Sequence, residues 1–237
     1  MLFNHSYIVD TTSAIHVWEH LGYPQFYVPV SDLRNCHWSN AGDIEGKSSK
    51  PGAAILKISV EGPEGKKETD RVIHFLKDGE AGQLAGLVRL EFGSMDGWLE
   101  EDTPIYVHPK DPFKRVDILQ SYRPVEVKVG GYSVAKTSGA LHLLETGLPT
   151  RYYLPLSSVD QTLLRKSDLI TRCPYKGEAQ YYDVVVVGGE TYKNLVWYYR
   201  TPTAESMAIA GTVCFYNEKV DTYLDGVLQE RPVTHFG

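Results

Sequence analysis

Residues 19–29 read EHLGYPQFYVP, and residues 145–155 read ETGLPTRYYLP. Both stretches carry Glu, Gly, Pro, Tyr and Pro in the same order at closely similar spacing, which chance rarely produces twice in one chain. The repetition extends upstream, where His16 and His142 each stand three residues before the shared Glu. We therefore expect a tandem duplication that builds two domains of one fold.

Later correspondences set the expected domain limits. Val116-Asp117, near the end of the first copy, corresponds to Val220-Asp221, near the end of the second. The first domain is therefore predicted to span residues 1–119 and the second residues 124–230. A linker at Gln120–Pro124 is expected to join them.

Period-two alternation predicts that most of the chain is β-strand. Val125–Val129 alternates apolar with charged residues and is followed by the turn pair Gly130-Gly131. The longer first copy has extra polar residues at Ser39–Gly52 and Glu61–Thr69, which are predicted loops. The other predicted strands are Ala54–Val60, Arg71–Phe75, Leu87–Phe92, Tyr181–Val187, Leu195–Tyr199, and the pair Thr212–Tyr216 and Val220–Leu224, which form a hairpin around Asn217-Glu218. The expected class is mainly β, as two small curved antiparallel sheets or open barrels with few short helices.

One short helix is predicted over Ala204–Ile209, with Thr203 as its N-cap. Ala140–Glu145 fits either a strand or one helical turn. The choice matters because His142 and Glu145 share one face of a helix but point to opposite faces of a strand. On one face they would form an acid–base couple. Otherwise each side chain serves a structural hydrogen bond.

The charge balance argues against nucleic-acid binding. The 24 Lys and Arg residues are outnumbered by 30 Asp and Glu, which gives a net charge of −6, whereas phosphate binding requires a clustered positive surface. No signal peptide is recognisable, and no apolar run approaches the ~18 residues of a spanning helix. Three widely spaced cysteines, Cys36, Cys173 and Cys214, argue against a disulfide framework. We expect a cytoplasmic protein with no membrane partner.

The densest motif is Thr171-Arg172-Cys173-Pro174-Tyr175-Lys176-Gly177. Its Pro and Gly predict a turn that presents Cys173, Tyr175 and Lys176 together, immediately before a strand. A thiol beside cations becomes nucleophilic because its pKa falls, and a partly buried lysine also has a lowered pKa and can act as a base. The alternative is a buried, inert cysteine and a solvated turn lysine.

Further motifs surround this one in a characteristic order: Leu144–Pro149, Tyr153-Leu154-Pro155, Val196-Trp197-x-Tyr199 and Phe215-Tyr216. Together they resemble the family catalogued as domain of unknown function 427, across about Val125 to Gly226. The resemblance implies a β-tent fold, hence two β-tent-like domains in tandem, and no established reaction. The family also carries a nucleotidyltransferase-like label. These residues do not support that label, because the chain has no Gly-rich phosphate loop followed by Lys-Ser/Thr.

The first copy keeps Glu19, Gly22, Pro24, Tyr27 and Pro29 but has no Cys-Pro-Tyr-Lys-Gly segment. It is expected to shape a shared cavity, cover the second copy or brace it. Relatives of similar fold hold zinc through Cys-x-x-Cys pairs. This chain has no such pair, and its single Cys-His dipeptide lacks further ligands at recognisable spacing, so no metal and no cofactor are expected.

The repeated carboxylate and tyrosine suggest the chemistry. Glu145 either caps backbone N–H groups at its Gly-x-Pro turn or faces a cavity lined by aromatic residues. In such a cavity its pKa would rise, which suits a general acid or base. The predicted catalytic residues are Glu145, Lys176, Cys173 and Tyr153, and the predicted substrate-binding residues are Arg151, Arg172, Tyr175, Tyr181, Trp197, Tyr199, Glu19 and Tyr27.

Three functions are compatible with these residues. The leading hypothesis is a metal-independent enzyme that acts on a small organic molecule by acid–base chemistry, through isomerisation, cyclisation, dehydration or hydrolysis, with Lys176 and Arg172 holding an anionic group. The alternatives are a non-catalytic small-molecule binding module, which uses the same aromatic pocket, and a structural or interaction protein. The expected partner is a small-molecule ligand or substrate. Tandem domains that mimic a dimer favour a monomer.

Overall fold

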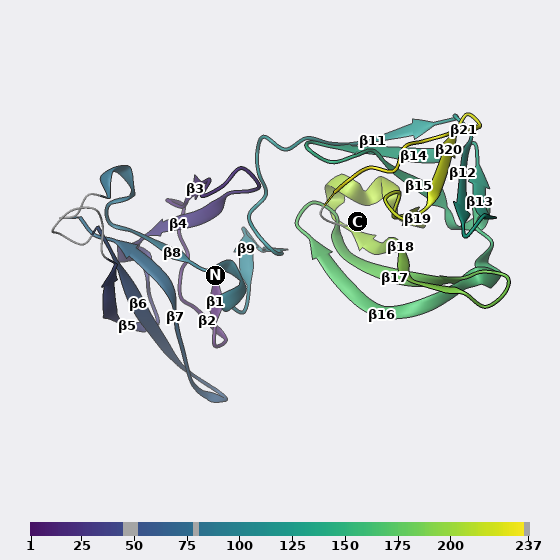
Figure 1. Cartoon of the computed structure of the whole chain (residues 1–237). Coiled ribbons are helices and arrows are strands. Elements are labelled where there is room, and N and C mark those ends of the chain that lie inside the picture. The colour runs from purple at the N-terminus through teal and green to yellow at the C-terminus, as the bar shows by residue number, and fades with distance from the viewer. Residues whose placement is uncertain (45–51, 78–80, 235–237) are drawn as a thin grey trace. The chain divides into compact units, whose positions relative to one another are not determined.

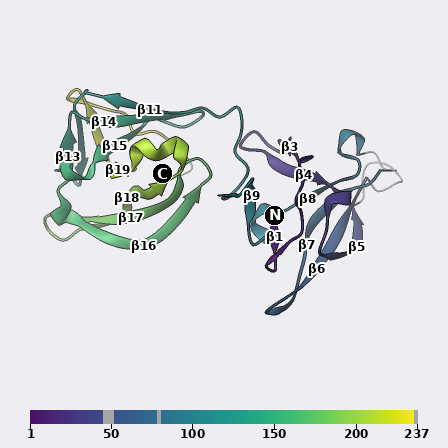
Figure 2. The ribbon, with the colours of Figure 1, turned by 180° about the vertical axis from the view of Figure 1, so that it is seen from behind.

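The computed structural model of the 237-residue chain describes residues 1–44, 52–77 and 81–234. The chain divides into two compact units, Met1–Asp111 and Pro112–Gly237, both visible in Figures 1 and 2. Each unit is mainly β, with antiparallel sheets and short 3-10 helices, and the described residues contain no α-helix. The predicted fold class, mainly β with small antiparallel sheets, is confirmed.

The second unit is built on a seven-stranded antiparallel sheet with the strand order β11-β14-β15-β19-β18-β17-β16. Its strands are β11 (Val116–Ser121), β14 (Ala140–Glu145), β15 (Arg151–Pro155), β16 (Leu164–Cys173), β17 (Gly177–Val185), β18 (Thr191–Pro202) and β19 (Thr212–Phe215). A four-stranded sheet, ordered β13-β12-β20-β21, contains β12 (Val125–Val129), β13 (Tyr132–Thr137), β20 (Asp221–Leu224) and β21 (Val227–Leu228). The 3-10 helices are η4 (Leu156–Ser158), η5 (Gln161–Leu163) and η6 (Ala204–Ile209).

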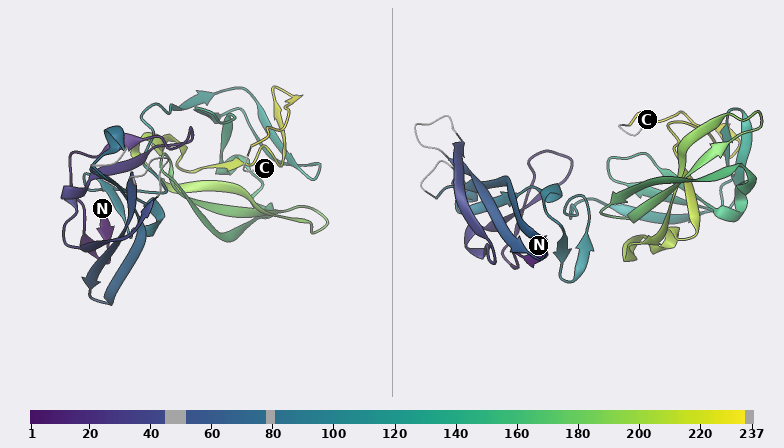
Figure 3. Two further views of the ribbon diagram at one scale, coloured as in Figure 1. Left: turned by 60° about the vertical axis from the view of Figure 1, so that its left-hand side comes forward. Right: turned by 90° about the horizontal axis from the view of Figure 1, so that it is seen from below.

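The first unit is built on a six-stranded antiparallel sheet with the order β3-β4-β8-β7-β6-β5. Its strands are β3 (Ile15–Val17), β4 (Gln25–Pro29), β5 (His37–Ile44), β6 (Ala53–Gly62), β7 (Gly65–Phe75) and β8 (Leu87–Leu90). Two small hairpins pair β1 (Leu2–Phe3) with β2 (Ser6–Tyr7), and β9 (Trp98–Glu100) with β10 (Thr103–Ile105). The 3-10 helices are η1 (Val30–Asp32), η2 (Gly82–Leu84) and η3 (Phe92–Ser94). Figure 3 shows β6 and β7 as a long hairpin.

Six strands follow the same order in the two units. Reading across the sheets, β3-β4-β8-β7-β6-β5 corresponds to β14-β15-β19-β18-β17-β16. Tyr27 of β4 lies opposite Arg89 of β8, and Tyr153 of β15 lies opposite Cys214 of β19. β4 and β15 also share one pattern of buried and half-buried residues, and each is followed by a 3-10 helix. The tyrosine of the repeated stretch therefore occupies the same place in both sheets.

The seven-stranded sheet carries different side chains on its two faces, because consecutive residues of a strand alternate in direction. Leu154 packs in an aliphatic core with residues of the four-stranded sheet, whereas its neighbour Tyr153 packs on the opposite face. We call that opposite face the aromatic face; its buried members are Leu143, Tyr153, Ala179, Tyr181, Trp197, Tyr199, Ile209 and Cys214. Figure 1 shows η6 inside the curve of the sheet, where it contacts β11 and β18. The fully buried Ile209 of η6 thus covers the aromatic face.

The boundary between the units lies earlier than the sequence predicts. Val116–Ser121 forms β11, which pairs with β14 along its whole length and so belongs to the second unit. Residues 112–119, assigned to the first domain from the sequence, are part of the second unit. The predicted correspondence of Val116-Asp117 with Val220-Asp221 is wrong, because both segments lie in one unit.

The polar segments predicted as loops of the first unit are mostly strand where the structure describes them; Pro63-Glu64 forms the turn of a hairpin and Gly52 a bend. β5 continues through Ile44, and Glu61–Thr69 forms the paired end of the β6–β7 hairpin. Residues 45–51 lie outside the described residues. Across the hairpin Lys57 contacts Glu68 at 2.5 Å. The polar composition of the two segments therefore reflects exposed strand faces more than irregular structure.

Three local predictions can be compared with the second unit. The strands on either side of Asn217-Glu218 form, but they do not pair, since β19 and β20 belong to different sheets. The predicted helix spans Ala204–Ile209 as a 3-10 helix. Thr203 occupies the predicted N-cap position, but its side chain makes no capping hydrogen bond, because its hydroxyl donates to the Tyr175 carbonyl at 2.5 Å. The ambiguous segment Ala140–Glu145 is a strand.

Candidate functional site

A buried turn carries the motif that dominates the second unit. Pro174, Tyr175 and Lys176 connect β16 to β17, and all three are buried. The Tyr175 carbonyl accepts hydrogen bonds from the hydroxyls of Thr203, at 2.5 Å, and Ser206, at 3.0 Å. Turns normally lie at the protein surface. Here η6 and its preceding residue hold the turn inside the unit, so Lys176 is only 8% exposed.

Gly177 closes this turn with a φ of +96°, and a Cβ at this position would meet the Thr201 carbonyl oxygen at 3.3 Å and the Thr203 nitrogen at 3.5 Å. We expect Gly177→Ala to reduce the free energy of unfolding by about 1–3 kcal/mol, measured by urea denaturation. Gly188→Ala is the matched control, because Gly188 has a φ of +100° with open space around it. Equal losses in the two variants would contradict a role for packing around the turn.

Glu145 is the centre of a buried charge cluster, which we define as Glu145, Lys176 and Lys114. Lys176 Nζ donates to Oε2 of Glu145 at 2.5 Å, and Lys114 Nζ lies 3.1 Å from Oε1. The side chains of Glu145, Lys176 and Lys114 are 6, 11 and 20% exposed. Cys173 lies near enough to Lys176 to contribute to the pKa of its ammonium group. The end of β14, the buried turn and the segment before β11 therefore each supply one charge.

The members of the charge cluster determine one another's protonation states. Burial acts to raise the pKa of Glu145, but Lys176 and Lys114 outweigh it and hold the pKa below its ordinary value. Burial acts to lower the pKa of Lys176, but Cys173 and Glu145 outweigh it and raise the pKa. The predicted directions, upward for Glu145 and downward for Lys176, are therefore wrong, because the two groups pair with each other. At neutral pH Glu145 is therefore a carboxylate and Lys176 an ammonium group.

The aromatic face approaches the charge cluster at Tyr153. Trp197 Nε1 donates to the Tyr153 hydroxyl at 3.0 Å, and the two rings meet edge to face with centroids 6.3 Å apart. Burial raises the pKa of Tyr153 well above its ordinary value, and the neighbouring Cys214, Cys173 and Glu145 add to this shift. Tyr153 therefore keeps its proton at neutral pH.

Two further tyrosines extend the same surface. The Tyr181 hydroxyl lies 2.8 Å from the Thr171 hydroxyl. Burial raises the pKa of Tyr199 well above its ordinary value, with contributions from Tyr153 and Cys173. The structure thus gathers most of the predicted site residues in one region: Glu145, Lys176, Cys173, Tyr153, Tyr175, Tyr181, Trp197 and Tyr199.

The two arginines predicted to bind substrate do not join the charge cluster. Arg151 lies 5.4 Å from the centroid of the Trp197 ring and forms a bidentate ion pair with Glu218, with both distances at 2.6 Å. Arg172 is 57% exposed and lies 3.3 Å from Glu178. By the strand period it points away from the face that carries Cys173.

His142, three residues before the repeated glutamate, does not contact it in the second unit. His142 and Glu145 both belong to β14, so they point to opposite faces of the sheet. The His142 ring instead packs edge to face on Tyr152, with centroids 4.9 Å apart. An acid–base couple between His142 and Glu145 is therefore not formed.

Glu19 and Tyr27 form a separate network within the first unit. The carboxylate of Glu19 accepts hydrogen bonds from the Tyr27 hydroxyl, at 2.9 Å, and from Arg89 Nε, at 2.8 Å. The repeated glutamate is thus paired with a cation in both units. The cation comes from β8 in the first unit and from the buried turn in the second.

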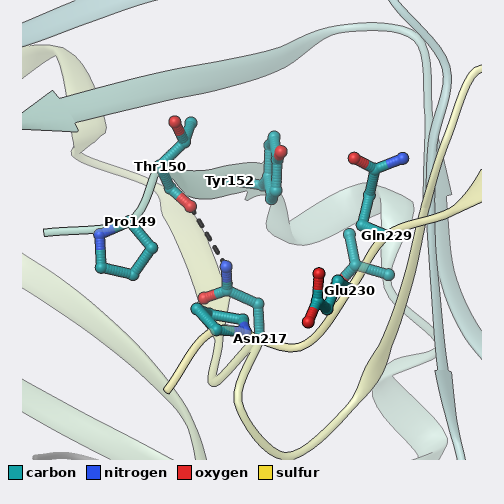
Figure 4. A pocket seen from close by; sticks show the side chains of 8 residues that line it. Pro149, Thr150, Tyr152, Asn217, Gln229 and Glu230 are labelled. Carbon is teal, nitrogen blue, oxygen red and sulfur yellow. Dashed lines mark hydrogen bonds between the residues drawn. The ribbon is translucent and has the colours of Figure 1, made fainter. Parts of the chain in front are cut away.

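A pocket of about 160 Å³ lies in the second unit, apart from the charge cluster. Figure 4 shows Tyr152 at its wall and Asn217 donating to the Thr150 carbonyl, at 3.2 Å. The lining residues are Pro149, Thr150, Tyr152, Asn217, Thr222, Gln229, Glu230 and Pro232. None of the predicted catalytic residues lines it. Ile209 of η6 packs with the aromatic residues of the aromatic face.

Lys114 is the member of the charge cluster that sequence reasoning missed. It lies outside both repeated stretches and outside the Cys-Pro-Tyr-Lys-Gly motif. Its position follows from the pairing of β11 with β14, and the Thr146 N–H donates to the Arg115 carbonyl at 3.0 Å. That contact draws the segment before β11 to the end of β14, where Glu145 lies.

Within residues 1–44, 52–77 and 81–234, no group of three or more His, Cys, Asp or Glu side chains is placed to hold a metal ion. In the same part of the chain, no helix has the length and apolar character needed to cross a bilayer.

The residues that match a known family lie within the second unit. Residues 117–226 match the family described as Domain of unknown function (DUF427). The matched range begins within β11 and ends after β20, so it contains all of the predicted catalytic residues. The first unit and Lys114 lie outside it. No curated protein matches the chain.

Proposed function

We propose that the second unit is a metal-independent enzyme that acts on a small organic molecule by acid–base chemistry. The observation that supports this proposal is the buried Glu145–Lys176 pair, which lies beside Cys173 and Tyr153. Burying an ion pair costs desolvation that apolar residues of similar size avoid. Buried titratable groups with shifted pKa values gather preferentially at functional sites. Isomerisation, cyclisation, dehydration and hydrolysis are the reactions that such groups serve without a cofactor.

Each group has a role that its protonation state permits. Glu145 is a carboxylate at neutral pH and acts as the general base. The Tyr153 oxygen accepts the indole N–H of Trp197, so its own proton is directed elsewhere and can be donated to a developing oxyanion. Lys176 orients Glu145, and Cys173 is a candidate nucleophile. Substrate entry requires η6 to move, because Ile209 covers the aromatic face.

Proton exchange provides a direct test. The protein is incubated in D₂O with a panel of small carbonyl compounds, carboxylic acids and phosphate esters, and ¹H NMR follows deuterium incorporation and product formation. Glu145→Gln is expected to slow the reaction by about 10²- to 10⁴-fold. Glu126→Gln is the matched control, because Glu126 also contacts two lysines, Lys128 at 3.9 Å and Lys136 at 3.8 Å, but in the four-stranded sheet.

The outcomes separate the three functions considered. Circular dichroism at the assay temperature first verifies that each variant is folded. Loss of turnover in Glu145→Gln with retained ligand binding supports the enzyme. Ligand binding without turnover, lost in Trp197→Ala, would support a non-catalytic binding module. An absence of both binding and turnover across the panel would contradict the proposal and favour a structural protein.

We also infer that the two units are copies of one fold. The supporting observations are the common order of six strands, the common register of Tyr27 and Tyr153, and the glutamate that each copy pairs with a cation. A family match confined to residues 117–226 is consistent with a first copy that has diverged further. An experimental structure with a different strand order in the first unit would contradict this inference.

A further inference from the structure

We propose that Lys114 binds an anionic group of the ligand, so that the second unit takes small molecules that carry a carboxylate or a phosphate. That this ligand is a substrate rests on the function proposed above. The binding site itself is defined by the charge cluster of Glu145, Lys176 and Lys114.

The charge cluster contains more positive than negative charge. Each oxygen of Glu145 is engaged by one lysine, Oε1 by Lys114 and Oε2 by Lys176. Two ammonium groups against one carboxylate leave a net charge of +1, in a chain whose net charge is −6. Among the described residues, the partners of Lys114 are Glu145 and the ring of Tyr175. A partly buried charge without full compensation is unfavourable, and a bound anion would compensate it.

Lys114 lies on the accessible side of this cluster. Its side chain is 20% exposed, against 11% for Lys176 and 6% for Glu145. An ammonium group has three N–H donors. One is directed to Glu145, and the Tyr175 ring, with its centroid 5.3 Å from Lys114 Nζ, occupies one side of the nitrogen. A remaining N–H can therefore donate to an oxygen of an incoming anion without displacing Glu145.

Isothermal titration calorimetry with sodium phosphate and with sodium malonate tests this proposal, with sodium chloride used to match the ionic strength. Lys114→Met is expected to weaken binding about tenfold to a hundredfold, the range of a hydrogen bond to a charged group. Lys114→Arg is expected to retain binding. Lys219→Met is the matched control, because Lys219 also lies over an aromatic ring, with Nζ 5.0 Å from the Tyr216 centroid.

Each result has a defined meaning. A preference for phosphate or for malonate identifies the anionic group. No binding by the native protein, or equal weakening in Lys114→Met and Lys219→Met, would overturn the proposal. Lys114→Met leaves Glu145 paired with Lys176, so its folding is expected to be retained, and Lys114→Arg provides a second measurement. Anion binding without proton exchange would reject the enzyme but keep this site. Proton exchange on uncharged compounds without anion binding would keep the enzyme but reject this anion site.

Discussion

Glu145→Ala is expected to lower the free energy of unfolding of the second unit by about 3–5 kcal/mol, because removing one partner of a buried ion pair leaves a buried charge without compensation. The loss is large here because two lysines share this carboxylate. After the substitution, Lys176 and Lys114 would face each other with no negative group between them. Urea unfolding followed by the fluorescence of Trp197, the only tryptophan after residue 111 in the sequence, measures the effect.

Comparison with other variants isolates the cause. Lys176→Met removes one of two cations and leaves Glu145 paired with Lys114, so we expect a smaller loss than for Glu145→Ala. The double variant Glu145→Leu/Lys176→Met removes both buried charges and is expected to recover most of the stability, since Lys114 can extend its ammonium group to solvent. Equal losses in the two single variants would show that packing, and not charge, determines the stability of this region.

The strands could be predicted from the sequence because alternation is a local property. Val125–Val129 forms β12 with the predicted bounds, and Gly130-Gly131 forms the predicted turn, with φ values of +56° and +84°. Pairing between strands depends on contacts distant in sequence. The adjacent strands around Asn217-Glu218 resembled a hairpin but belong to two sheets. The boundary between the units was misplaced because β11 pairs with β14, about 25 residues later in the chain.

The candidate site was predictable where the repeat or the motif marked it. Glu145 and Tyr153 stand in the repeated stretch, and Lys176 stands in the Cys-Pro-Tyr-Lys-Gly motif. Neither the repeat nor the motif indicated which neighbouring residues determine the protonation states of these side chains. Lys114 reaches Glu145 through the β11–β14 pairing. The direction of the pKa shift of Glu145 depends on those partners, and composition alone suggested an aromatic environment that would raise it.

Glu218→Gln is expected to cost about 3–5 kcal/mol at neutral pH, because it leaves the buried guanidinium of Arg151 without its counter-charge. The side chains of Arg151 and Glu218 are 8 and 2% exposed. Arg151 also contacts Asn217 and lies over the Trp197 ring. Urea unfolding monitored by Trp197 fluorescence reports the loss, and Glu178→Gln, at the exposed pair with Arg172, is the matched control with an expected effect below about 1 kcal/mol.

Acid titration distinguishes the ion pair from simple packing. Burial acts to raise the pKa of Glu218, but hydrogen bonds from Arg151 and Thr234 outweigh it and lower the pKa to about 2. A carboxyl group whose pKa is lower in the folded state stabilises the protein above its ordinary pKa, and this stabilisation is lost as the pH falls toward the folded value. The native protein should therefore lose stability between about pH 5 and pH 2, whereas Glu218→Gln lacks this component. The difference between the two proteins should narrow as the pH falls. A constant difference would show that the carboxyl group acts through its shape and not through its charge.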